Sequence, residues 1–189
     1  MSSSNFIRWC ALVAMVGGVT YASLGLLGPL YVYLYAPSSD EDIPPVLNYI
    51  PSVFLFFMLL GAMATIAGLH ALQRERYGLP GVVASLTAFV GVATILVGGL
   101  VDILAGQRYP VVAYILIAGV LLATVGLLAL GAITIGARML PWWCGASIIL
   151  GSPPFAILLG PLVGAAWALV GYALLRQAGV LRTQNTPQE

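Results

Sequence analysis

Residues 150–161, LGSPPFAILLGP, place three prolines and two glycines inside the last apolar stretch of the chain. The whole stretch runs from Pro141 to Arg176, which is 36 residues. A helix needs roughly 20 residues to cross a hydrocarbon core about 30 Å thick. The stretch is therefore too long for one ordinary span and barely long enough for two, and these twelve residues decide between five helices and six.

The composition as a whole indicates that the natural solvent of this chain is lipid. Hydrophobic residues make up 61% of its 189 residues and charged residues 7%, and the mean hydropathy is +1.03. A soluble domain carries about 25% charged residues. All seven basic residues are arginine, which excludes a lysine Schiff base and a P-loop lysine. The net charge of +1 offers no footprint for nucleic acid.

Apolar runs of spanning length predict an all-α fold, a polytopic transmembrane bundle of six helices in a single domain. The arginines decide the count, because cytoplasmic loops are enriched in basic residues near helix ends. Six crossings put six arginines on one side and Arg108 alone on the other, whereas five crossings give four against three. The alternative is five helices, the last of them long and kinked. The expected spans are residues 9–34, 51–72, 79–104, 111–136, 142–159 and 161–176.

The same distribution predicts a cell-membrane protein with both termini cytoplasmic. Residues 178–189 then form a cytoplasmic tail, and residues 36–50 form an external loop that carries Asp40, Glu41 and Asp42. Three adjacent carboxylates on an extended segment point to alternate sides, so they do not converge as a calcium site requires. We therefore expect a solvated acidic loop without a bound metal.

Glycines seven residues apart recur in the expected spans more often than shuffling of this composition gives. Two turns of helix return a residue to the same face, so each pair marks a side on which a neighbouring helix approaches closely. We expect a compact bundle packed through these faces. The pairs are Gly18 and Gly25, Gly61 and Gly68, Gly91 and Gly98, Gly119 and Gly126, and Gly164 and Gly171, with Gly99 and Gly106 as a sixth.

The proline pair in the opening stretch marks a candidate site. If helix five continues through residues 153–154, the carbonyls of Ile149 and Leu150 lose their N–H partners. Together with the Ser152 hydroxyl these carbonyls would line a polar or cation site, as in broken transporter helices. The alternative is a purely structural one, in which a neighbouring helix, the Ser152 hydroxyl or one water donates hydrogen bonds to these carbonyls. A rival geometry starts helix six at Pro153 with Ser152 as its N-cap.

Other embedded polar and aromatic side chains are also candidates. Asp102 is the one carboxylate inside an expected span, within a turn of its external end. Asp102 is either an interfacial acid that pairs with Arg108, or a group that couples protons or binds a cation. Trp167 and Tyr21 fall near the middle of their expected spans. They either pack as aromatic side chains in the bundle or line a small pocket. His70 is the only histidine, so one chain cannot hold a bis-histidine haem, and we expect no cofactor or metal.

The chain resembles a loosely defined group of small, uncharacterised bacterial multi-pass membrane proteins in three segments. Two are arginine-bearing turns followed by Leu-Pro, RERYGLPG at 74–81 and ARMLPWW at 137–143. The third is LLGPLVGAAWALVGYALLRQ at 158–177. The resemblance covers about the last two-thirds of the chain. It implies six helices and supplies neither an activity nor site residues.

The residue sets of known intramembrane proteases are missing: a serine with a histidine base at membrane depth, an aspartate pair, or H-E-x-x-H. The sequence therefore favours a non-enzymatic binding, accessory or structural membrane component. A small-solute or ion-coupled transporter is the main alternative, and a lipid-modifying enzyme is the other. The expected partners are membrane lipid and further copies of the chain or a larger membrane complex, but not nucleic acid.

Overall fold

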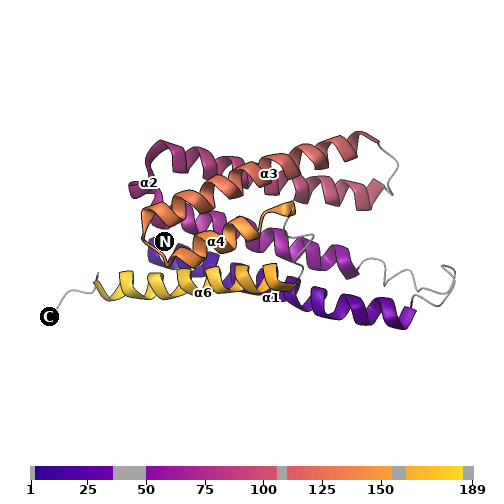
Figure 1. Cartoon of the computed structure of the whole chain (residues 1–189), viewed down its shortest axis with the longest axis horizontal. Helices are drawn as coiled ribbons and strands as arrows, with labels where there is room; N and C mark the ends of the chain where they lie inside the picture. Colours follow the sequence, from indigo (N-terminus) through magenta and orange to yellow (C-terminus); the bar gives the residue numbers. More distant parts are fainter. Residues whose placement is uncertain (1–2, 36–49, 106–109, 155–160, 185–189) are drawn as a thin grey trace.

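The computed structural model describes residues 3–35, 50–105, 110–154 and 161–184, and within these ranges the chain is helical with no strand (Figure 1). Four of the described helices are long and apolar enough to cross a membrane. The predicted all-α fold, with helices able to span a membrane, is confirmed for the described residues. The predicted count of six helices is not confirmed. The helices are α1 (Ser3–Tyr35), α2 (Ile50–Ala105), α3 (Pro110–Ala137), α4 (Trp142–Leu150) and α6 (Pro161–Gln184).

Helix α2 is a hairpin of two helical arms. At Gly78 the backbone turns with φ 57° and ψ −155°, a conformation open to glycine because glycine has no Cβ. Pro80 follows, where a missing N–H is tolerated at the start of a helix. The first arm, residues 50–77, and the second arm, residues 79–105, fold back beside each other (Figure 1). They correspond to the second and third predicted spans.

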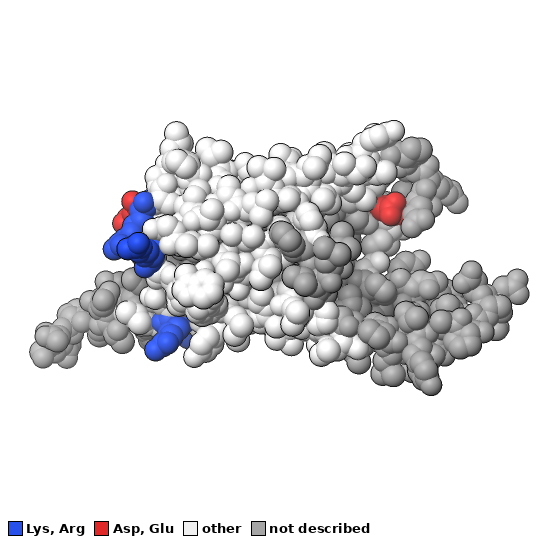
Figure 2. Space-filling model, viewed as in Figure 1, with Lys and Arg blue, Asp and Glu red and all other residues white. Residues whose placement is uncertain are grey.

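The chain runs up and down, so that the Ser3 end of α1 and the Gln184 end of α6 lie at the same end of the bundle (Figure 1). The described arginines gather at that end beside Glu75, which lies between Arg74 and Arg76, and acidic atoms also lie near the other end (Figure 2). These belong to Asp102, near the end of the second arm of α2. We call the two ends the arginine end and the acidic end. The exposed arginines concerned are Arg8, Arg74, Arg76, Arg138 and Arg176.

Glycines bring the helix backbones into direct contact. A Cβ on Gly91 would lie 2.6 Å from the Cα of Ala123 in α3, and one on Gly126 would lie 2.5 Å from the Cα of Ala88 in α2. Every glycine of the first five predicted pairs whose surroundings are described faces another helix, so those packing faces are confirmed. The prediction is wrong for Gly99 of the sixth pair, where a Cβ would meet nothing within 4 Å. Further close contacts join Gly17 with Gly61, Gly18 with Gly164, Gly171 with Ala11, and Gly131 with Gly145.

In the predicted fifth span, 142–159, the helix is interrupted before the proline pair. Helix α4 ends at Leu150, and the next residue, Gly151, caps it. Pro153 has no N–H to give to the carbonyl of Ile149 four residues before it. That carbonyl instead accepts a hydrogen bond from the N–H of Ser152 at 3.1 Å, which closes a tighter turn.

Helical backbone resumes at Pro153 and Pro154, which agrees with the rival start of a helix at Pro153. Residues 155–160, including positions 156 and 157 that were expected in helix five, lie outside the described residues. The nine residues of α4 rise about 14 Å, roughly half of a hydrocarbon core.

The last predicted span ended at residue 176, with a tail from residue 178, but α6 continues to Gln184. Ala178 is fully buried, so packing against the bundle extends beyond the predicted end. The side of the membrane on which residues 178–184 lie stays a prediction, because a helix can continue beyond the membrane, and residues 185–189 lie outside the described part of the chain.

Candidate functional site

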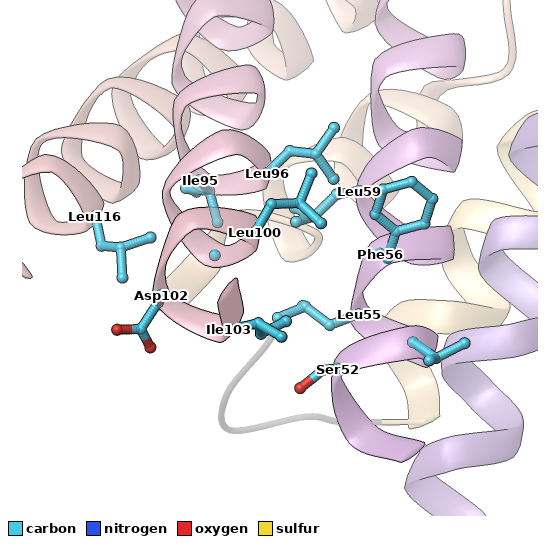
Figure 3. Close-up of a pocket in the computed structure, with 12 residues that line it drawn as sticks. Ser52, Leu55, Phe56, Leu59, Ile95, Leu96, Leu100, Asp102, Ile103 and Leu116 are labelled. Atoms are coloured by element: carbon cyan, nitrogen blue, oxygen red, sulfur yellow. The ribbon is translucent and has the colours of Figure 1, made fainter. Parts of the chain in front are cut away.

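A groove of about 510 Å³ lies between the two arms of α2 and reaches α3 (Figure 3). Its lining comes from residues 52–59 of the first arm, residues 95–103 of the second arm, and Leu116 of α3. All of these lining side chains are nonpolar except those of Ser52 and Asp102. The volume falls in the range of about 300–1,000 Å³ that is usual for small-molecule sites. We call this feature the α2–α3 groove.

Two adjacent glycines determine the shape of the groove. A Cβ on Gly98 would lie 2.8 Å from Cδ2 of Leu116, so Gly98 packs against α3. A Cβ on Gly99 would meet nothing within 4 Å, so Gly99 opens onto free space. Leu96 and Leu100 point across this space toward Phe56 and Leu59 of the first arm (Figure 3). The side chains of the groove thus present a largely hydrocarbon surface.

Ser52 and Asp102 both line the groove near the acidic end, but from different arms of α2: the Asp102 carboxylate lies on the Leu116 side of the second arm, and Ser52 lies on the first arm (Figure 3). Asp102 is partly buried, three residues before α2 ends at Ala105. The carboxylate thus lies within one turn of the end of its helix, and its depth in a membrane stays a prediction. Arg108, its suggested partner, lies outside the described residues. Sequence reasoning missed Ser52 and the groove itself, for which the double glycine 98–99 is the only signal.

The end of α4 forms a second polar feature. Ser152 Oγ and Trp167 Nε1 are buried, with their residues 0% and 4% exposed, and neither atom has a hydrogen-bond partner among the described residues. The Trp167 indole covers Gly151, because a Cβ there would collide with Nε1. The structure thus brings two of the predicted site residues to the helix break. We call this feature the α4 break.

The other predicted residues are placed differently. The Ile149 carbonyl accepts the N–H of Ser152. The role of the Leu150 carbonyl stays a prediction, and the side chain of that residue is 42% exposed on the surface of the bundle. Tyr21, on α1, packs against the apolar core. Asp102 belongs to the α2–α3 groove, so the six predicted residues do not form a single site.

A buried polar cluster at the arginine end joins the two arms of α2 to α3. The Tyr77 hydroxyl lies 2.9 Å from Nδ1 of His70 and 3.1 Å from Oγ of Ser85, on the second arm. The Thr134 hydroxyl of α3 donates to Oε1 of Gln73 at 3.3 Å. His70, the only histidine of the chain, is partly buried in this cluster. The spacing of 70, 73 and 77 on one helix face was the signal that sequence reasoning missed.

Within the described residues no three His, Cys, Asp or Glu side chains are grouped as a metal site. Cys10 and Cys144 are buried free thiols. Comparison of the chain with protein-family models, with curated proteins and with solved structures finds no match. The function is therefore argued from the groove and the helix break.

Proposed function

We propose that this chain is a non-enzymatic, multi-pass protein of the cell membrane that binds the hydrocarbon chain of a lipid in the α2–α3 groove. The observation that supports this function is an apolar groove of about 510 Å³ with polar groups at one end only. Among its lining side chains, Leu55, Leu100 and Ile103 are 40–41% exposed at the bundle surface. In a bilayer that surface faces lipid tails, which fill the space and gain dispersion contacts with its walls.

The proposal includes six crossings with both termini in the cytoplasm. The arginine end supports it, since basic residues favour the cytoplasmic side. Helices α3 and α6 run in the same direction in the bundle (Figure 1), so the chain between them returns across the membrane. In this proposal α4 forms the first half of that return. The acidic end, with the mouth of the groove, then faces the external leaflet.

Filling the groove tests the proposal. Gly99→Leu places a side chain in the open space beside Gly99, so we expect it to exclude a lipid tail without disturbing the helix contacts. Gly136→Leu is the matched control, because a Cβ on Gly136 in α3 also meets nothing within 4 Å. Purified protein is incorporated into vesicles that contain a phospholipid with a diazirine in one acyl chain, irradiated and digested.

We expect the diazirine lipid to label peptides of both α2 arms in the wild-type chain and in Gly136→Leu. We expect Gly99→Leu to lose most of that label while keeping its melting temperature. Equal labelling of all three proteins would show that lipid contacts the surface at random, and would overturn the proposal.

An ion-coupled or small-solute transporter is the second candidate, favoured by the α4 break. An interrupted helix with buried, unpartnered polar atoms is the kind of place where transporters bind substrate, and Ser152 and Trp167 supply such atoms. Proton- or sodium-driven uptake into proteoliposomes that is lost in Ser152→Ala and kept in Gly99→Leu would favour this second function. Absence of uptake for a panel of ions and small solutes would favour lipid binding.

A further inference from the structure

The first turns of α1 have a polar face on the outside of the bundle. Ile7, Cys10 and Ala11 are buried, so they fix the side of this helix that packs inward. The residues at positions 5, 8, 9 and 12 are exposed and line one hollow. Their spacing puts their side chains on the same side of a helix. We call this surface the α1 face, which consists of Asn5, Arg8, Trp9 and Leu12.

Polarity changes along the α1 face from the end of the bundle toward its middle. The segment Ser4–Ser23 is apolar enough to span a membrane, so Asn5 and Arg8 lie in its first turns. Leu12 follows Asn5 by about 10 Å along the helix axis, and its side chain is 43% exposed. Trp9 lies between them and is 62% exposed, and tryptophan is enriched at the headgroup level of membranes. The face therefore fits a lipid whose polar group lies near the helix end and whose hydrocarbon lies deeper.

The polar side chains of the α1 face supply hydrogen-bond donors and no negative charge. The guanidinium of Arg8 has five N–H donors in a fork that matches two oxygens of a phosphate. The amide of Asn5 and the indole of Trp9 have further N–H donors. Among the described residues, the Arg8 side chain has no hydrogen bond or ion pair. These donors favour a ligand with several acceptor oxygens, as a phosphate group has.

The surroundings of the α1 face are also positively charged. Five described arginines, Arg8 among them, gather at this end of the bundle with one described carboxylate, Glu75 (Figure 2). Residues 1 and 2 have no acidic side chain, and residues 185–189 have one, Glu189. The positive sign of the arginine end therefore does not depend on the residues that the structure leaves undescribed. A positive surface beside a bilayer attracts anionic lipid.

We infer that the arginine end binds anionic phospholipid of the adjacent leaflet, and that the α1 face holds the phosphate of one such lipid through Arg8. A zwitterionic phospholipid also has a phosphate, but its ammonium group cancels the net charge and is repelled by the arginines. The acyl chains of the bound lipid continue past Leu12 along the outside of α1. This surface and the mouth of the α2–α3 groove lie at opposite ends of the bundle, so the inference does not rest on the proposed function.

A photoreactive lipid tests the inference on the full-length chain in vesicles of phosphatidylcholine. One sample contains a trace of phosphatidylglycerol and the other a trace of phosphatidylcholine, each with the same diazirine in one acyl chain. After irradiation and digestion with pepsin, mass spectrometry measures the label on peptides that cover residues 5–12. We expect the glycerol lipid to label these peptides about fivefold more than the choline lipid, the scale of one basic residue at a membrane surface.

Substitutions of single arginines separate the α1 face from the rest of the arginine end. Arg8→Gln removes the charge and keeps N–H donors, so the ratio of the two labels should fall below about twofold. Arg8→Lys keeps the charge without the fork, so its ratio should lie between those of the wild type and Arg8→Gln. Arg138→Gln is the matched control, because it removes an exposed arginine directly after α3, outside the α1 face. We expect it to keep most of the wild-type ratio.

The outcomes decide the inference independently of the groove. Equal labelling of residues 5–12 by the two lipids in the wild type would overturn it. An equal loss of preference in Arg8→Gln and Arg138→Gln would show that charge acts diffusely, and would overturn the role given to Arg8. Gly99→Leu should keep the wild-type ratio at residues 5–12 whether or not it loses the label in the groove, so the two proposals succeed or fail separately.

Discussion

Alanine at Gly91 or Gly126 should weaken the bundle, because both glycines press against backbone and not against movable side chains. The nearest atoms to a Cβ at either position include a backbone nitrogen of the facing helix. The Cα of Ala123 would lie 2.6 Å from a Cβ at position 91, whereas ordinary contacts begin near 3.4 Å. The second arm of α2 and α3 must therefore separate by nearly 1 Å.

The expected cost follows from that separation. A gap of 0.5–1 Å forfeits about a quarter to a half of the dispersion energy of each contact across it, and overpacked cores lose about 1–3 kcal/mol. The higher helix propensity of alanine returns at most about 1 kcal/mol. We expect Gly91→Ala and Gly126→Ala each to lower the free energy of unfolding by about 1–2 kcal/mol.

Reversible unfolding in mixed micelles of mild detergent and dodecyl sulfate measures this free energy. Gly99→Ala is the control on the same helix, since its Cβ meets nothing within 4 Å. The double variant Gly91→Ala with Ala123→Gly should not recover stability, because the collision is with backbone atoms of Ala123. Recovery in the double variant, or equal stability of Gly91→Ala and Gly99→Ala, would refute the reasoning.

Three further predictions concern the turns and the topology. Gly78→Ala should cost about 1–3 kcal/mol, because a Cβ is disfavoured in the backbone conformation that turns α2; an unchanged melting temperature would contradict this. Gly151→Ala should lower the melting temperature by forcing the Trp167 indole off the α4 break, and combination with Trp167→Ala should remove the difference; a full additional loss would show that the collision is not the cause. On a background without native cysteines, Asp40→Cys should react with an impermeant maleimide on intact cells and Asn185→Cys only after permeabilisation; external labelling at position 185 would exclude six crossings.

The positions of the long helices could be predicted from the sequence because they depend on run length alone. The predicted spans 79–104 and 111–136 agree with the second arm of α2 and with α3 to within a residue at each end, whereas the first arm continues five residues beyond the predicted span 51–72. The glycine pairs also predicted which faces pack, since only glycine lets backbones meet so closely. The length of an apolar run and the spacing of glycines are both local features of the sequence, and neither requires knowing which face of a helix meets lipid.

The groove could not be predicted, because in a membrane the outward and inward faces of a helix are equally apolar. On α3, Leu121 is 61% exposed and Leu127 is 2% exposed, yet both are leucine. The alternation of polar and apolar residues that identifies the buried face of a soluble helix is absent. Without it, the sequence does not show which side of residues 95–103 faces the first arm and which faces lipid.

The groove lies where close packing of α2 and α3 ends. Toward the middle of the helices the facing residues are small, and Gly91 and Gly126 meet backbone directly. Toward the acidic end the facing residue of α3 is Leu116, and Gly98 meets its side chain instead of backbone. Larger side chains hold the helices apart, and Gly99 leaves the resulting space unfilled. The change in side-chain size along the second arm of α2 and α3 therefore has two results. It gives the rigid contact between these helices, and next to Asp102 it gives the opening that we propose a lipid tail enters.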